Sequence, residues 1–199
     1  MRKPILSIRG FLSDLKTTEE IDARYKKIEI IENKINDIDH DLGDLQKYSK
    51  LSYSAENFSK ILMSDILNHI YTSLNPDCEA NAIHLNIDTQ NIYVYAKKNT
   101  LISVLNNLIF NAIEHAECKT IEINATKYKG TCKITVIDDG KGLENENKVF
   151  MPYYTDSGDT DHMGLGLYIC KQYLASMGGN LLYSRENNQT CFTLFLPLA

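Results

Sequence analysis

Apolar side chains recur every three or four residues through the first 45 positions, which is the spacing of one face of an α-helix. Residues 1–16 predict a first helix, with Pro4 in its first turn, where a missing N–H is tolerated. A polar link at residues 16–20 follows, and Thr17 or Thr18 is placed to cap the next helix. The apolar seam of that second, long helix consists of Ile28, Ile31, Ile35, Ile38, Leu42 and Leu45. A seam this narrow predicts a helix that pairs with another helix.

Two helices of this size bury too little apolar surface to be stable alone. We therefore expect residues 1–55 to form an antiparallel helical hairpin that pairs with its copy as a dimeric four-helix bundle. On this interpretation the protein is a homodimer. A generic coiled-coil stalk would show the same periodicity and is the alternative interpretation of this segment.

From residue 56 onward the pattern changes to a mixture of helical and strand periods, which predicts a second domain at 56–199. A third helix is expected from Asn57 to about Leu74. Further helices are expected at Thr100–Ala116 and Gly164–Met177, and strands at His84–Ile87, Ile92–Tyr95, Thr120–Ala125, Cys132–Ile137, Leu181–Ser184 and Thr190–Leu196. This α+β mixture suits a two-layer sandwich with helices on one face of a mixed sheet.

Composition narrows the function classes. The net charge is −5 and no basic run reaches five residues, so neither nucleic acid nor an anionic membrane surface is an expected partner. No apolar run approaches the roughly 18 residues of a membrane span, and the N-terminus lacks the apolar core of a signal peptide, so we expect a cytoplasmic chain. The cysteines are odd in number and widely spaced, which favours free, mostly buried thiols over a zinc site.

Two asparagines, Asn107 and Asn111, lie four residues apart in the apolar stretch Val104–Ala116 and therefore share one helix face. An unsatisfied buried amide costs about 1–3 kcal/mol, so the pair indicates either a polar cluster or a ligand. The carbonyl oxygen of Asn111 has the chemistry to bind Mg²⁺.

Two later segments carry glycines at informative places. Asp138 follows an apolar strand and precedes Gly140 and Gly142, which we expect to adopt positive φ and to allow close approach of a ligand. Gly164–Leu167 opens a predicted helix, whose free N–H groups and positive dipole end can hold phosphate oxygens. Taken singly, an ordinary turn explains the first segment and close helix packing explains the second.

In this order the segments Val104–Ala116, Val136–Leu143 and His162–Lys171 resemble the N, G1 and G2 boxes of the GHKL ATP-binding fold, most closely that of sensor histidine kinases. The resemblance covers nearly the whole chain. It implies a sandwich of the GHKL ATPase type, with ATP and Mg²⁺ as cofactors. It also implies phosphoryl transfer to a histidine, then to an aspartate in the receiver domain of a response regulator.

The resemblance also implies roles for individual residues. Asn111 would hold Mg²⁺, Asn107 would act at the phosphates as the catalytic amide, and Asp138 would accept a hydrogen bond from the exocyclic amine of adenine. Val149–Thr155 resembles the F box that anchors a lid over the nucleotide. The other residues that would bind the nucleotide are His115, Gly140, Gly142, Tyr153, Gly164, Leu165, Gly166 and Leu167.

The chain departs from the family pattern at three places. Glu114 stands where these kinases often carry a phosphate-facing lysine, and His162 replaces the first glycine of the G2 box. Arg2–Leu12 resembles the downstream half of the H box, so the acceptor histidine is expected to fall just before Met1. His40, followed by an aspartate, is the rival acceptor.

Two alternative functions follow from these departures and from the fold. A degenerate phosphotransfer or scaffold protein would dimerise and dock a response regulator without using ATP. An anti-sigma-type serine kinase shares the fold, but the Arg2–Leu12 segment and the long hairpin argue against it.

Overall fold

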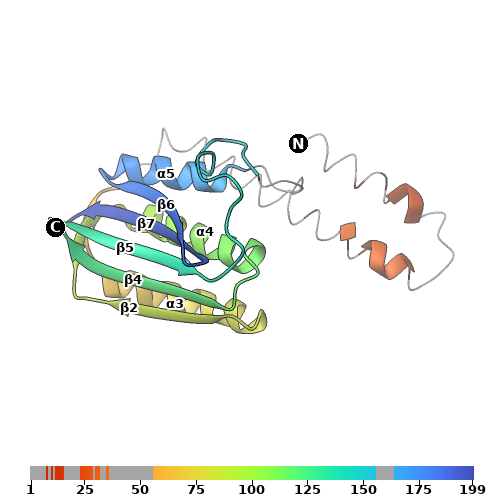
Figure 1. Ribbon diagram of the computed structural model, residues 1–199, viewed down its shortest axis with the longest axis horizontal. Coiled ribbons are helices and arrows are strands. Elements are labelled where there is room, and N and C mark those ends of the chain that lie inside the picture. The colour runs from red at the N-terminus through yellow and green to blue at the C-terminus, as the bar shows by residue number, and fades with distance from the viewer. Residues whose placement is uncertain are drawn as a thin grey trace.

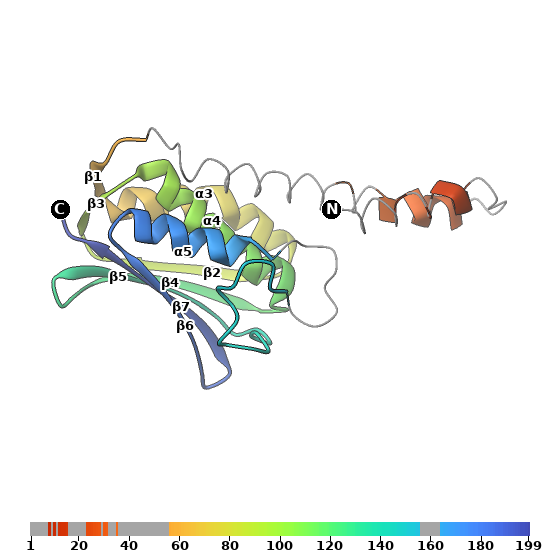
Figure 2. The same cartoon turned by 90° about the horizontal axis from the view of Figure 1, so that it is seen from above.

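The computed structural model describes residues 8, 10, 12–15, 23–28, 30–31, 35, 56–155 and 164–199. From residue 56 onward, the described chain forms a layer of helices on one face of a β-sheet, and Figure 2 shows the two layers. The predicted α+β sandwich is therefore confirmed for this part of the chain.

The helices and strands follow the predicted order closely. In chain order they are β1 (Ser59–Leu62), α3 (Met63–Ala80), β2 (His84–Thr89), β3 (Tyr93–Ala96), α4 (Lys98–His115), β4 (Thr120–Tyr128), β5 (Thr131–Asp138), α5 (Gly166–Ser176), β6 (Asn180–Glu186) and β7 (Gln189–Pro197). All six predicted strands and both later helices are present, and their ends move by three residues or fewer.

The main sheet has five strands in the order β2-β4-β5-β7-β6. β2 runs parallel to β4, and the other neighbouring pairs are antiparallel. Alternate residues of β5 and β7 are buried, as expected when one face of a sheet is covered. α3 packs against β2, α5 packs against β6 and β7, and α4 lies between the two helices (Figure 1). The central strand β5 therefore lies beneath the middle helix, α4.

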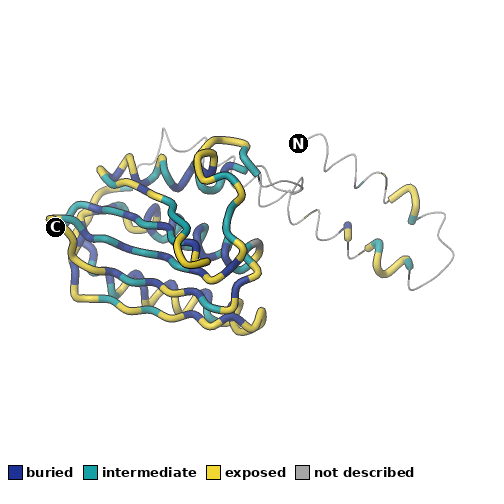
Figure 3. Tube along the Cα trace, in the orientation of Figure 1, coloured by how far each residue is buried: buried dark blue, intermediate teal, exposed yellow. Residues whose placement is uncertain are grey.

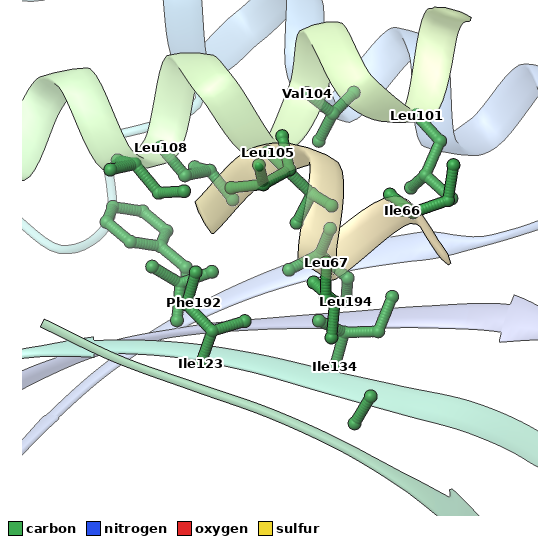
Figure 4. Packing of buried hydrophobic residues seen from close by; sticks show 14 of the residues in the cluster. Ile66, Leu67, Leu101, Val104, Leu105, Leu108, Ile123, Ile134, Phe192 and Leu194 are labelled. Carbon is green, nitrogen blue, oxygen red and sulfur yellow. The ribbon is translucent and has the colours of Figure 1, made fainter. Parts of the chain in front are cut away.

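The apolar core fills the space between the sheet and the helices. Figure 3 shows buried positions recurring along the helices and strands, and Figure 4 shows side chains of α3 and α4 pointing toward the sheet. Leu105 and Leu108 of α4 face Ile123, Ile134 and Leu194 of the sheet, and all five side chains are buried. This packing fixes the rotation of α4 about its axis, and so fixes where its polar side chains lie.

The prediction of a helix from Asn57 to about Leu74 is wrong at both ends. Ser59–Leu62 form β1, which pairs antiparallel with the distant strand β3 in a separate two-stranded sheet. A four-residue strand is too short to show a period, and its partner is not local. α3 instead continues through Pro76 to Ala80, because the carbonyl that loses its hydrogen bond belongs to exposed Thr72, where solvent can replace it.

Only scattered residues of the predicted hairpin are described, and all of them are helical. Of the predicted seam, Ile28 and Ile35 are exposed and Ile31 is buried. Ile38, Leu42, Leu45 and the rival acceptor His40 lie outside the described residues. The antiparallel hairpin, the four-helix bundle and the domain boundary between residues 55 and 56 therefore stay predictions.

Two predictions from composition can be compared with the structure. All five cysteines are free, and four of them, Cys78, Cys118, Cys132 and Cys170, are buried, as expected. Among the described helices, none combines the length and the apolar character needed to cross a bilayer.

Candidate functional site

The polar face of α4 carries the two predicted amides. Asn107 and Asn111 are half-buried, and the Asn111 Nδ2 donates to the Asn107 Oδ1 at 3.4 Å. Their i, i+4 spacing places one amide above the other along the helix, so this contact follows directly from the sequence. The bond uses the amide nitrogen of Asn111 and leaves its carbonyl oxygen, the atom that a hard cation prefers, outside the contact.

The start of α5 lies against this amide face. A Cβ built on Gly166 would come within 2.9 Å of both terminal atoms of the Asn107 amide, so a larger residue would displace this amide. The Cys170 thiol, one turn further along α5, contacts the Asn107 Oδ1 at 3.5 Å. The N-cap residue of α5 is Leu165, whose side chain makes no cap hydrogen bond. The N–H groups at the start of an α-helix, together with its positive dipole end, are suited to an anion.

Asp138, the last residue of β5, is 4% exposed. Its Oδ1 accepts a hydrogen bond from the backbone N–H of Gly140 at 3.0 Å. Burial raises the pKa of Asp138 above its ordinary value, although the Gly140 N–H, the Thr190 hydroxyl and the Arg185 guanidinium oppose the rise. A buried carboxylate with one oxygen committed to the backbone is a selective acceptor for a donor on a ligand.

The loop after β5 is fastened to the segment that joins α4 to β4. The Asp139 Oδ1 accepts from the backbone N–H groups of Lys119 at 2.7 Å and Thr120 at 2.9 Å. Partial burial raises the pKa of Asp139, but these hydrogen bonds outweigh burial and lower it overall. The backbone N–H of Lys141 also donates to the carbonyl of Ala116 at 2.8 Å. The end of α4 and the start of this loop are thereby held together.

The expectation that Gly140 and Gly142 both adopt positive φ is only half correct. Gly142 has φ of +73°, but Gly140 is not among the residues with positive φ. The reason for a glycine at position 140 is steric, because a Cβ there would collide with the Ala116 carbonyl. Gly140 therefore allows close approach of the loop to α4, whereas Gly142 supplies the turn.

The F-box segment packs against α5 at one end and meets Gly164 at the other. Val149 is buried, and the Lys171 ammonium lies 4.5 Å from the centre of the Phe150 ring. The backbone N–H of Tyr153 donates to the Gly164 carbonyl at 2.9 Å, while the Tyr153 side chain is 66% exposed. This hydrogen bond joins the described residues before position 156 to those after position 163.

Some predicted residues cannot be placed from the structure. His162 lies outside the described residues, and the side chain of His115 is not described. Glu114 and Lys148 are both exposed. Within the described residues no group of three or more His, Cys, Asp or Glu side chains could hold a metal ion. A cation at this site would therefore need ligands from a bound phosphate as well as Asn111.

Four contributors to this region were missed by sequence reasoning. Arg185, Tyr183 and Thr190 surround the loop after β5, and Glu56 caps the start of α4. Each acts through a contact between segments far apart in the chain, so neither local period nor composition gave a signal for it.

The loop after Asp138 and the start of α5 thus both contact the second half of α4. Residues 96–199 match the family model of histidine kinase-, DNA gyrase B- and HSP90-like ATPases. The chain belongs to this ATPase family. The predicted resemblance to sensor histidine kinases of the GHKL type is confirmed, because named sensor kinases match along nearly the whole chain.

Two curated relatives show the extent of the match. Sensor histidine kinase ArsS of Helicobacter pylori is 27% identical over 197 residues, which cover 98% of this chain and 44% of that protein. Sporulation kinase C of Bacillus subtilis is 30% identical over 209 aligned residues, covering 100% of this chain and 46% of that protein. The chain therefore spans less than half the length of these relatives.

Solved structures share the fold. The histidine kinase AdeS of Acinetobacter baumannii superposes with a TM-score of 0.75 at 18% identity, covering 99% of this chain and 96% of that one. The histidine kinase ThkA, solved in complex with the response regulator protein TrrA, gives 0.81 at 23% identity, covering 100% of this chain and 58% of that one. At sequence identities this low, the structural similarity shows that this chain shares the fold of these kinases.

Proposed function

We propose that this chain is the ATP-binding kinase region of a two-component sensor histidine kinase. One observation carries the proposal: two segments that are far apart in the sequence both contact the second half of α4. Gly166 at the start of α5 packs on Asn107, and the loop that follows Asp138 is bonded to Ala116 at the other end of that half-helix. An acceptor for a base, an amide pair and a helix start are thus arranged along one helix.

Each part of the site has a proposed task. The ionised Asp138 accepts a hydrogen bond from the exocyclic amine of adenine, and its burial makes an unmatched base costly to bind. The backbone N–H groups of Gly164–Leu167 hold phosphate oxygens at the positive end of α5. Asn107 lies between this helix start and Asn111, and orients the terminal phosphate.

The donor set fits a magnesium ion that is shared with the nucleotide. Asn111 offers an amide oxygen, which would take the place of the carboxylate that usually holds Mg²⁺ together with phosphates in phosphoryl-transfer sites. When bound, Mg²⁺ neutralises negative charge on the phosphates that are being transferred. His115, Tyr153, Gly140 and Gly142 complete the proposed set around the nucleotide.

A homodimer and a response-regulator receiver domain are the proposed partners. Two described residues of the predicted seam, Ile28 and Ile35, are 39% and 46% exposed in a single chain, which supports burial by a second copy. The relatives named as sensor kinases support the receiver domain as the final phosphoryl acceptor. The acceptor histidine is proposed to precede Arg2, and His40 remains the rival candidate.

A regulator-docking scaffold that does not use ATP is the second candidate. Glu114 favours it, because an exposed carboxylate stands one helical turn from Asn111, where a cation would assist phosphate binding. Nucleotide binding separates the two candidates, since the scaffold would give no heat of binding.

The first prediction concerns Asp138. Titration of the whole chain with ADP in the presence of Mg²⁺ is expected to show binding by calorimetry, and Asp138→Asn is expected to weaken it by about tenfold to a hundredfold, the value of one lost charged hydrogen bond. Asp139→Asn is the matched control, because it removes the same charge one residue away and keeps an oxygen for its backbone contacts. It should bind like the wild type.

No heat with millimolar nucleotide would reject the kinase proposal and favour the scaffold. Equal weakening by the two substitutions would reject Asp138 as the group that contacts the base.

A further inference from the structure

Asp138, Thr190 and Arg185 lie side by side on three neighbouring strands, at one end of the main sheet. Asp138 of β5 is the register partner of Thr190 in β7, and Thr190 is the register partner of Arg185 in β6. Register partners on neighbouring strands share a face of the sheet, so all three side chains belong to the face that the helices cover. Thr190 is buried, and its hydroxyl accepts a hydrogen bond from the Arg185 Nη1 at 3.1 Å. The same hydroxyl contacts the Asp138 carboxylate.

The Arg185 guanidinium also holds the loop after β5 directly. Its Nη1 and Nη2 both donate to the Gly140 carbonyl at 3.1 Å. The N–H of Gly140 donates to the Asp138 Oδ1. Arg185 therefore holds the carbonyl of the same residue whose N–H orients the Asp138 carboxylate. A Cβ built on Gly142 would collide with the guanidinium, so the loop is moulded around this side chain.

Tyr183 makes a second contact from the same strand. It lies two residues before Arg185 and therefore on the same face of β6. Its hydroxyl oxygen accepts a hydrogen bond from the backbone N–H of Leu143 at 3.2 Å, and its ring packs against Phe192 at 5.3 Å between ring centres. The loop at 139–143 is thus bonded by β6 on one side and by the end of α4 on the other.

We infer that Arg185 and Tyr183 are positioning residues that act as a clamp on the loop after Asp138, and that this clamp sets the affinity and the base preference of the nucleotide site. The inference rests on the proposed function. Neither residue needs to touch the nucleotide, because each acts through the loop that places the Asp138 carboxylate. Arg185 has the larger share, since a planar guanidinium makes three of these contacts.

The clamp has an electrical consequence as well as a steric one. The positive charge of Arg185 lowers the pKa of Asp138 against the larger effect of burial. The other ionisable groups close to Asp138 are Asp139, whose charge raises its pKa, and the Cys118 thiol and Tyr183 hydroxyl. Both of the latter are uncharged at neutral pH, since their ordinary pKa values lie above neutrality and burial raises them further. Removing the guanidinium is therefore expected to raise the pKa of Asp138 further.

The test measures ADP and GDP binding to the whole chain by calorimetry, across a range of pH, for Arg185→Gln, Arg185→Lys and Tyr183→Phe. Arg185→Gln should weaken ADP binding by about tenfold and reduce the preference for ADP over GDP. As the pH is lowered, the ADP affinity of Arg185→Gln should also begin to fall at a higher pH than that of the wild type, because protonated Asp138 cannot accept a hydrogen bond from the amine.

The other variants separate charge from geometry. Arg185→Lys keeps the charge but not the fork, so it should retain the wild-type pH midpoint while binding ADP less tightly. Tyr183→Phe should have a smaller effect, of about threefold, without a shift in pH midpoint. Glu186→Gln, an exposed neighbour on β6, is the control and should behave as the wild type.

Two failures are distinguishable. A wild-type chain that binds neither nucleotide removes the proposed function, and the clamp with it. A wild-type chain that binds ADP, with Arg185→Gln and Arg185→Lys that match it in affinity, base preference and pH midpoint, overturns the clamp alone. If Arg185→Gln does not fold, the ADP affinity of Arg185→Lys decides the outcome by itself, and a wild-type affinity overturns the clamp.

Discussion

Asp138 and Asp139 are neighbours of one residue type with opposite environments. Burial raises the pKa of Asp138, whereas hydrogen bonds from the Lys119 and Thr120 backbones lower that of Asp139. Their surroundings explain the difference, because Asp138 is the buried last residue of β5, whereas Asp139 follows the strand and accepts from two backbone N–H groups. One carboxylate is therefore available to a ligand, and the other fastens the fold.

The sign of the Asp138 shift gives a stability prediction. A carboxyl group with a raised folded-state pKa holds its proton more tightly in the folded chain, so its ionised form lowers the free energy of unfolding at neutral pH. Without nucleotide, Asp138→Asn is expected to unfold at an equal or higher temperature than the wild type at pH 7. The difference should shrink as the pH falls through the raised pKa.

Scanning calorimetry of the two nucleotide-free proteins at several pH values makes this measurement. A variant that unfolds well below the wild type at pH 7 would show that ionised Asp138 stabilises the fold. In that case the burial of this charge would be explained by the stability of the fold, and ligand binding would not be needed to explain it.

At the scale of single residues, the pattern predicted the placement of those that depend on their own segment. Asn107 and Asn111 were found because helical spacing alone brings them together, and Asp138 because it ends an apolar strand. Arg185 could not be found in this way. Its partners belong to a loop two strands away, and only the register of β6, β7 and β5 brings them within reach.

At the scale of elements, long periodic segments were predicted well and short non-local ones were not. β1 was missed because its partner β3 is distant in the sequence, and the start of α3 was misplaced as a result. The cap of α4 was missed for the same reason. The N-cap residue Lys97 makes no side-chain cap, and Glu56, which precedes β1, supplies it instead.

Glu56 holds the first turn of α4 through both carboxylate oxygens. Oε1 accepts from the backbone N–H of Asn99 at 2.6 Å, and Oε2 accepts from the backbone N–H of Thr100 at 3.1 Å and from its hydroxyl at 2.7 Å. Partial burial raises the pKa of Glu56, but these hydrogen bonds outweigh burial and lower it overall. The charged form is therefore favoured by the fold.

Glu56→Ala is expected to lower the free energy of unfolding by about 1 kcal/mol, the usual value of a helix cap. Because the folded-state pKa is lowered, the contribution is complete above the unfolded-state pKa and is lost as the pH falls through the folded value. Urea unfolding at neutral and acidic pH measures both effects. Glu56→Gln keeps an accepting oxygen and should lie between the wild type and Glu56→Ala.

If Glu56→Ala were as stable as the wild type at neutral pH, the contact would contribute nothing to stability. If the difference did not shrink in acid, it would not depend on the charge of Glu56.

At the scale of the whole molecule, the open question is assembly. Helical residues with apolar side chains, among them Leu12, Ile28 and Ile35, are exposed in the single chain. Ile35→Asp combined with Leu42→Asp is expected to give a monomer whose residues 56–199 remain folded. Each unpaired charge in a bundle core costs about 3 kcal/mol or more.

Light scattering at micromolar concentration measures the mass, and circular dichroism the folding. Lys26→Asp, at an exposed position off the predicted seam, should remain a dimer. A wild-type chain that is already monomeric at that concentration would contradict the predicted bundle.

Helix α4 also sets the distance between two groups of contacts. Glu56 accepts hydrogen bonds from its first turn at Asn99 and Thr100, while Gly166 packs on Asn107 and the loop after Asp138 bonds to Ala116. A single residue inserted between these two groups of contacts would turn the second half of the helix by about 100° and advance it by about 1.5 Å. The amide pair would then leave the start of α5. The length of this helix is therefore constrained by the contacts at both of its ends, independently of the side chains that it carries between them.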